Sequence, residues 1–126
     1  MADEITLTVP REKPFYRVAH LVLGGLAVRL DLTFDTLEDL QVALAGLLSR
    51  EDTGDGDVTV AVRVLPDALL AAIGPFEADV LQREWDSDAD FGLRRILETV
   101  CDGVQVTDRN GGRYVELTKS LRTVSA

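Results

Sequence analysis

The chain has 126 residues, a length typical of one domain. Its 22 acidic residues outnumber its 13 basic ones, which gives a net charge of −9. That charge argues against a nucleic-acid binder, which needs a basic face for phosphate contacts, and against docking on an anionic membrane. A basic protein partner is compatible with it, and so is plain solubility.

Cysteine usage and the apolar pattern exclude further classes of protein. Cys101 is the only cysteine, so the chain has no disulfide framework and no thiolate metal site. The acidic start, Met-Ala-Asp-Glu, differs from a secretory signal, which begins with positive charge. The longest apolar stretch, 18–28, is interrupted by His20, Gly24 and Gly25 and is too short for a membrane span. These features predict a cytoplasmic protein.

Two apolar periodicities predict the first elements. Residues 4–9 alternate between apolar side chains and threonines, as in a half-buried strand. From 15 to about 30, apolar residues recur at helical spacing and predict a helix with one broad apolar stripe. Gly24 and Gly25 lie inside it and cost about 1 kcal/mol each relative to alanine. Close packing against a sheet or a partner helix would explain them, and so would a break in the helix.

A second helix and two strands are expected next. Thr33 or Asp35 is placed to cap a helix whose leucines keep helical spacing to about residue 50. After a polar, acidic loop, valines alternate from 58 to 64 and predict the clearest strand of the chain. Residues 69–73 form a short apolar run, which we expect to pair back as an antiparallel strand.

The last part of the chain is predicted to hold a third helix and a hairpin. Apolar residues at helical spacing over 91–101 predict the helix, and the aspartates before it favour its positive end. Strands are expected at 104–107 and 114–118, joined by the strong hairpin signal Asn-Gly at 110–111. The predicted fold is a two-layer α/β (α+β) sandwich. Its mixed, mostly antiparallel sheet carries about three helices on one face.

Two acidic motifs resemble functional sites but favour ordinary explanations. Asp52-Thr53-Gly54 spells the aspartic-protease triplet, but charged neighbours favour a solvated loop over a buried shared proton. The aspartates of 86–90 begin like a calcium loop, yet glycine and glutamate are missing from the sixth and twelfth positions that the loop requires. Capping of the following helix explains these aspartates better.

The remaining candidate groups predict no chemistry on their own. His20 is the only histidine and has no cluster of ligands on its helical face, so we expect a structural or half-exposed residue. Cys101 lies on the apolar side of its helix, which predicts a buried, inert thiol. No Walker loop, dinucleotide fingerprint or nucleophile elbow is present.

A series of phrases in a fixed order carries a resemblance to a known family. They are Ile5-Thr-Leu-Thr-Val-Pro10, Asp39-Leu-Gln-Val-Ala-Leu44, the valine strand from Val58, Phe91-Gly-Leu-Arg-Arg-Ile-Leu97, Asp102-Gly-Val-Gln-Val106 and Gly111-Gly-Arg-Tyr-Val-Glu-Leu117. In this order they resemble the bacterial anti-sigma-factor serine kinases of the histidine-kinase-like (GHKL, or Bergerat) ATPase superfamily. The resemblance covers about 4–121. It implies that residues 1–126 form a single domain of the Bergerat fold.

The resemblance also implies a nucleotide pocket, and the chain departs from the family at that pocket. The family has a glutamate that activates water and, four residues later, an asparagine that holds magnesium; those positions hold Gly46 and Arg50. Gly46 offers no carboxylate, and Arg50 cannot ligate magnesium, although it could contact phosphate directly. The aspartate that binds adenine is replaced by Pro75, or by Gly74 with one gap. Gly92 remains of the glycine-rich lid.

Three functions are compatible with this sequence. The first is a non-catalytic regulator, a pseudoenzyme without ATP or magnesium, that acts by protein binding in partner-switching control of transcription or stress. The resemblance implies a sigma factor or an anti-sigma antagonist as partner, often a homodimer, and no nucleic acid or membrane. The second is an active ATP-dependent anti-sigma serine kinase, which requires a different placement of the motifs at Gly46 and Pro75. The third is a structural or assembly domain that reuses the fold, for instance through the Gly24-Gly25 face.

Overall fold

A computed structural model describes residues 3–49, 56–76, 93–109 and 112–121. The elements follow the expected order, each close to its predicted range. They are strand β1 (Asp3–Pro10), helices α1 (Lys13–Arg29) and α2 (Phe34–Ser49), strands β2 (Asp57–Val64) and β3 (Ala68–Phe76), helix α4 (Leu93–Val100), and strands β4 (Gly103–Arg109) and β5 (Gly112–Ser120).

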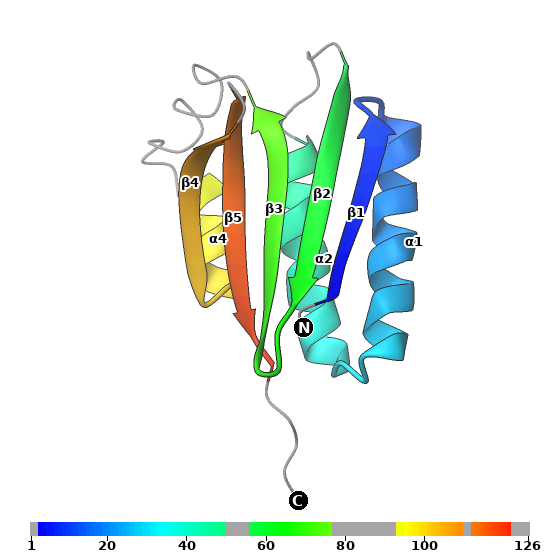
Figure 1. The fold of residues 1–126 in the computed structure, drawn as a ribbon, viewed down its shortest axis with the longest axis vertical. Helices are drawn as coiled ribbons and strands as arrows, with labels where there is room; N and C mark the ends of the chain where they lie inside the picture. Colours follow the sequence, from blue (N-terminus) through cyan, green and yellow to red (C-terminus); the bar gives the residue numbers. More distant parts are fainter. Residues whose placement is uncertain (1–2, 50–55, 77–92, 110–111, 122–126) are drawn as a thin grey trace, which may run out of the picture.

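The five strands form one sheet with the helices on a single face (Figure 1). The strand order is β1-β2-β3-β5-β4, and each neighbouring pair is antiparallel. The described part of the sheet is therefore antiparallel throughout, whereas the sequence predicted a mixed, mostly antiparallel sheet. The two-layer sandwich predicted from the sequence is confirmed.

Strand alternation decides which side chains reach the helices. In the pairing of β1 with β2, Ile5 lies opposite Val62 and Val9 lies opposite Val58. These apolar residues point to the helix layer, and the threonines between them point away, because successive side chains alternate across a strand. The alternation seen in the sequence is thus the inner and outer face of the sheet.

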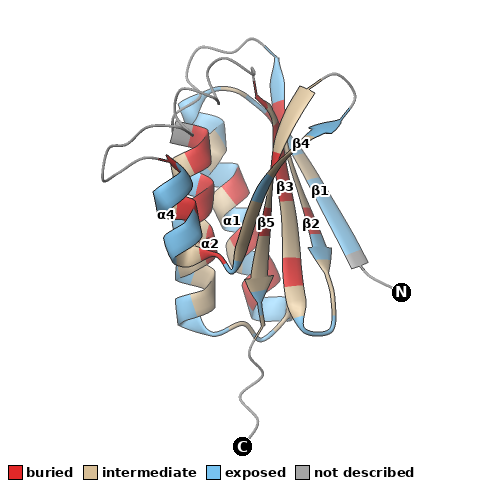
Figure 2. Cartoon of the chain, turned by 90° about the vertical axis from the view of Figure 1, so that its left-hand side faces the viewer, coloured by how far each residue is buried: buried red, intermediate tan, exposed pale blue. Residues whose placement is uncertain are grey.

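In the described part of the chain, the core lies between the sheet and helices α1, α2 and α4 (Figure 2). Helix α2 is the central helix and packs against α1 on one side and α4 on the other. It contributes the largest share of buried residues, which are Leu40, Ala43, Leu44, Leu47 and Leu48. Each fully buried leucine contributes about 1.5–3 kcal/mol to stability.

The turn between the first two helices uses local hydrogen bonding. The backbone N–H of Thr36 donates to the Thr33 hydroxyl over 3.1 Å, so Thr33 caps α2 as predicted. Asp31, in the same turn, has a φ of 55°, a conformation that aspartate tolerates better than most residues. Helix α1 continues unbroken through Gly24 and Gly25, so a helix break does not explain these glycines.

Within the described ranges, none of the helices is both long and apolar enough to cross a membrane.

Candidate functional site

Gly46, which the sequence resemblance predicts to stand at the family's catalytic glutamate, lies at the contact between two helices. Gly46 is near the end of α2, and α2 and β3 end at the same edge of the domain (Figure 1). A Cβ atom on Gly46 would lie 3.8 Å from Leu93 Cδ1 and 3.8 Å from Ile96 Cγ2, both on α4. Leu93 is itself buried. A side chain at residue 46 therefore starts among aliphatic groups.

Pro75 and Gly74, the two candidates for the position of the family's adenine-binding aspartate, lie where β3 meets the neighbouring strand β5. The pairing of β3 with β5 shifts register between Ile73 and Phe76, and the Gly74–Pro75 peptide within this stretch is cis. A Cβ atom on Gly74 would lie 2.8 Å from the Arg113 carbonyl oxygen and 2.9 Å from ring carbons of Tyr114. Aspartate at 74 would therefore require β5 to move.

Arg11, which follows β1, contacts this end of β3. Its guanidinium donates a hydrogen bond to the Pro75 carbonyl oxygen and lies 5.9 Å from the centre of the Phe76 ring. Sequence analysis did not single out Arg11. The contact joins residues 64 positions apart, and no local pattern signals it. Arg11 thereby links the end of β1 to the end of β3.

The structure brings together only some of the predicted positions. Gly74 and Pro75 lie side by side at the end of β3, and Gly46 faces α4. Arg50 and Gly92 lie outside the described residues. The same is true of the triplet 52–54 and the aspartates of 86–90.

Lys119 forms a second polar contact, between the sheet and the helices, that sequence analysis did not predict. Its ammonium donates to Asp39 Oδ2 over 2.8 Å and to the Val100 carbonyl oxygen over 2.8 Å. The Lys119 side chain is only 15% exposed, so these bonds are well shielded from water. Lys119 continues the inward row of Val115 and Leu117 on β5, a signal that we overlooked because the strand was predicted to end at 118. The lysine joins β5, α2 and the end of α4.

Cys101 and His20 have the environments expected of them. Cys101 is buried, and burial raises the pKa of its thiol to about 11; Asp102 and Asp39 act in the same direction, and Lys119 opposes them. The thiol is therefore protonated at neutral pH. His20 is half-buried on α1, and burial lowers its pKa. Among the described residues, no three His, Cys, Asp or Glu side chains gather to hold a metal ion.

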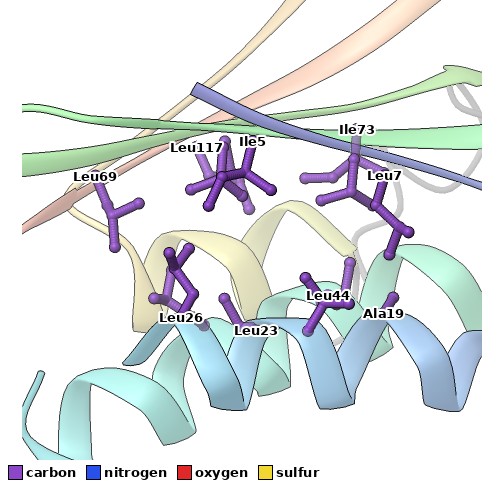
Figure 3. A pocket seen from close by; sticks show the side chains of 14 residues that line it. Ile5, Leu7, Ala19, Leu23, Leu26, Leu44, Leu69, Ile73 and Leu117 are labelled. Atoms are coloured by element: carbon purple, nitrogen blue, oxygen red, sulfur yellow. The ribbon is translucent and has the colours of Figure 1, made fainter. Parts of the chain in front are cut away.

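An apolar cavity of about 40 Å³ lies between the sheet and the first two helices (Figure 3). Its lining is almost entirely aliphatic and comes from α1, α2 and four strands. Ala19 on α1 and Ala71 on β3 are the smallest side chains that line it. No described polar group is aimed into it that would hold a nucleotide, so we treat it as a packing defect beside α1.

Comparison with known proteins gives a consistent set of relatives. The serine-protein kinase RsbW of Bacillus velezensis is 28% identical, over 94% of this chain and 86% of its own length. RsbW of Bacillus subtilis is 26% identical over 95% and 87%, and RsbW of Listeria monocytogenes is 25% identical over 84% and 80%. The family resemblance is confirmed. No protein-family model matches the chain.

The chain is shorter than its relatives inside the matched region. The match to the Bacillus velezensis RsbW runs over 140 aligned positions, although the whole chain has only 126 residues. The chain therefore lacks residues that this RsbW carries between matched segments.

Proposed function

We propose that this chain is a non-catalytic regulator that acts by binding protein partners in the cytoplasm, as an anti-sigma factor without kinase activity. The observation that carries this proposal is the environment of Gly46. The residue at the proposed position of the catalytic base has no carboxylate, and the space beside it is lined by Leu93 and Ile96. A general base needs a titratable group within reach of a water or hydroxyl, and glycine offers none.

The residues at the carried-over positions also do not fit a magnesium-bound nucleotide. Magnesium requires oxygen ligands, and the carried-over position for its asparagine holds Arg50 in the sequence. Gly74 has no side chain to accept a hydrogen bond from adenine, and β5 leaves no room for one.

The partner that we propose is a sigma factor or a small anti-sigma antagonist. This follows from the resemblance to the anti-sigma kinases, together with the name of the relatives, serine-protein kinase RsbW. The net charge of −9 suits a partner with basic regions, because complementary charge speeds association and excludes like-charged proteins.

An active serine-protein kinase is the second candidate, and the name shared by the relatives favours it. Catalysis would then depend on residues outside the described ranges. The two candidates differ in one simple measurement. Mg-ATP at 100 times its dissociation constant would stabilise a nucleotide-binding chain by about 2.7 kcal/mol and raise its melting temperature. A non-catalytic regulator shows no such shift.

The test of the proposed function is binding to purified partners. The chain is titrated in a calorimeter with each sigma factor and each antagonist domain of its own organism, with EDTA present and nucleotide absent. We expect one of them to bind with micromolar or tighter affinity, and added Mg-ATP to leave that affinity unchanged. Binding that appears only with Mg-ATP would contradict the proposal.

A further inference from the structure

The face of the sheet that points away from the helices carries a shallow trough. None of the other described elements lies over this face (Figure 2). The trough has a volume of about 150 Å³, similar to that of an engineered cavity that binds benzene. Charged and amide side chains line it, unlike the aliphatic cavity on the helix side of the sheet. A polar hollow of this size suits a small molecule.

Strand register explains the shape of the trough. Ala61 of β2 and Ala72 of β3 lie opposite each other, and Leu70 is two residues before Ala72 on the same face of β3. Longer side chains rise from the strands on either side of β3, Arg63 from β2 and Glu116 from β5. The short side chains form a floor, and the two long ones form walls.

The wall on β5 is a carboxylate that its neighbours hold in place. Glu116 Oε1 accepts a hydrogen bond from Gln105 Nε2 over 3.0 Å, and Oε2 accepts one from the Arg109 guanidinium. The Glu116 side chain is only 24% exposed. A carboxylate offers about four acceptor positions, so the two described donors leave about two of them open. Glu116 can therefore still accept hydrogen bonds from a cation in the trough.

The wall on β2 is a cation without a described partner. Arg63 is exposed and makes no hydrogen bond or ion pair with another described residue. Glu4, its neighbour across the strand pair, is also exposed and also lines the trough. Two arginines and two glutamates thus surround the floor and their charges cancel, although the whole chain carries −9. This balance suits a ligand with one charge of each sign.

We propose that the trough binds a small apolar α-amino acid as its zwitterion. Glu116 binds the ammonium, and Arg63 binds the carboxylate, which a guanidinium matches with two parallel hydrogen bonds. The walls rise from strands that are two strand spacings apart, about 10 Å. An α-amino acid with one charge-assisted hydrogen bond at each end spans about 9 Å. Its side chain lies on Ala61, Ala72 and Leu70.

The two charges select a free amino acid over a segment of protein. Inside a peptide the amino and carboxyl groups are amides, and neither carries a charge. The trough also lies on the opposite side of the sheet from the contact of Gly46 with α4. Binding there requires neither nucleotide nor a protein partner, so this proposal and the proposed function can each fail alone.

An NMR titration of the full chain, labelled with nitrogen-15, tests the proposal with L-valine as the probe. We expect saturable shifts of backbone amides in β2, β3 and β5 around the trough, with a dissociation constant in the millimolar range. Glycine lacks the apolar side chain and should bind at least tenfold more weakly. N-acetyl-L-valine lacks the ammonium and L-valinamide lacks the carboxylate, so each should also bind at least tenfold more weakly.

Two variants test the assigned groups. Arg63→Gln removes the partner of the carboxylate and should weaken binding at least tenfold. Its melting temperature should not change, because Arg63 has no described partner to lose. Arg94→Gln is the matched control, since Arg94 lies on α4, on the other side of the sheet, and its variant should bind L-valine normally. Ala72→Leu fills the floor without removing a charge and should abolish the shifts.

Three results would overturn the proposal. The first is the absence of saturable shifts with L-valine up to tens of millimolar. The second is equal binding of L-valine, its N-acetyl derivative and its amide, which would mean that the two charges are not recognised. The third is binding that Arg63→Gln leaves unchanged. None of them bears on nucleotide or sigma-factor binding, which the titrations above measure separately.

Discussion

Helices α2 and α1 both carry glycine in their interiors, and the two glycine sites have opposite surroundings. A Cβ atom on Gly46 of α2 would contact Leu93 and Ile96 of α4, whereas one on Gly24 of α1 would meet no atom of the described residues within 4 Å. On α2, the glycine lies against apolar side chains of the chain itself. On α1, Gly24 is half-buried, with open space beside it. The same residue type therefore lies at a packed helix contact in one helix and beside open space in the other.

Substitution of Gly46 should have the largest effect, and it tests how tightly α2 and α4 pack at this residue. Gly46→Glu should lower the free energy of unfolding by about 2 kcal/mol, because the carboxylate must enter the aliphatic contact between α2 and α4. Gly46→Ala is the control at the same position. Its methyl group fits at ordinary contact distance and should stabilise the helix by about 0.5–1 kcal/mol. Urea unfolding measures both, and a Gly46→Glu variant as stable as the alanine variant would show that the site is open.

Replacement of Lys119 tests what keeps α4 against α2. Lys119→Met removes a shielded ammonium and leaves Asp39 and the Val100 carbonyl without their donor. We expect a loss of about 1.5 kcal/mol in urea unfolding. Arg94→Met is the matched control, because the Arg94–Glu98 pair has side chains 56% and 54% exposed and should contribute less than about 0.5 kcal/mol. Equal losses of unfolding free energy in the two variants would mean that the contacts of Lys119 stabilise the fold no more than an exposed ion pair does.

Filling the cavity beside α1 should raise the stability of the fold. Ala71→Val adds two methyl groups on the sheet face that lines the cavity and should stabilise the fold by about 1 kcal/mol. Ala61→Val is the control, since residue 61 lies on β2 with its side chain on the opposite face of the sheet. A gain from Ala61→Val as large as that from Ala71→Val would reflect strand propensity alone. Thermal unfolding distinguishes the two outcomes.

The smallest expected effect on the unfolding free energy comes from the thiol of Cys101, just after α4. Burial raises its pKa from 9.0 to about 11, so the folded protein keeps a proton that the unfolded chain loses first. This contribution to stability is fully present below pH 9.0 and is lost as the pH rises towards about 11. The difference in unfolding free energy between the native chain and Cys101→Ala should therefore shrink across that range. A constant difference would mean that the thiol is accessible to water.

Much of the fold could be predicted from local patterns because the physical cause was local. Strands β1 and β2 alternate in sequence since each has one face on the helices and one in solvent. The Asn-Gly turn signal predicted the closing hairpin. Strand β4, which begins at Gly103, and strand β5, which begins at Gly112, pair antiparallel, as the two strands of a hairpin do.

The unpredicted features depend on residues distant in sequence. Arg11 and Pro75 meet only because β1 and β3 end at the same edge of the sheet. Lys119 reaches Asp39 across 80 positions, and the alternation of β5 predicted its direction but not its partner. For Gly24 the sequence allowed three explanations, and the structure removed the helix break and the internal packing.

Calorimetric titration of the pure chain with ATP and with ADP, each with and without magnesium, tests the central claim most directly. The account predicts no heat of binding at high protein concentration under any of the four conditions. At the positions that the resemblance assigns to base, magnesium and adenine, Gly46, Arg50 and Pro75 (or Gly74) offer no carboxylate, oxygen ligand or side-chain acceptor. Magnesium-dependent binding in the micromolar range would contradict it and would make the chain an active member of the kinase family.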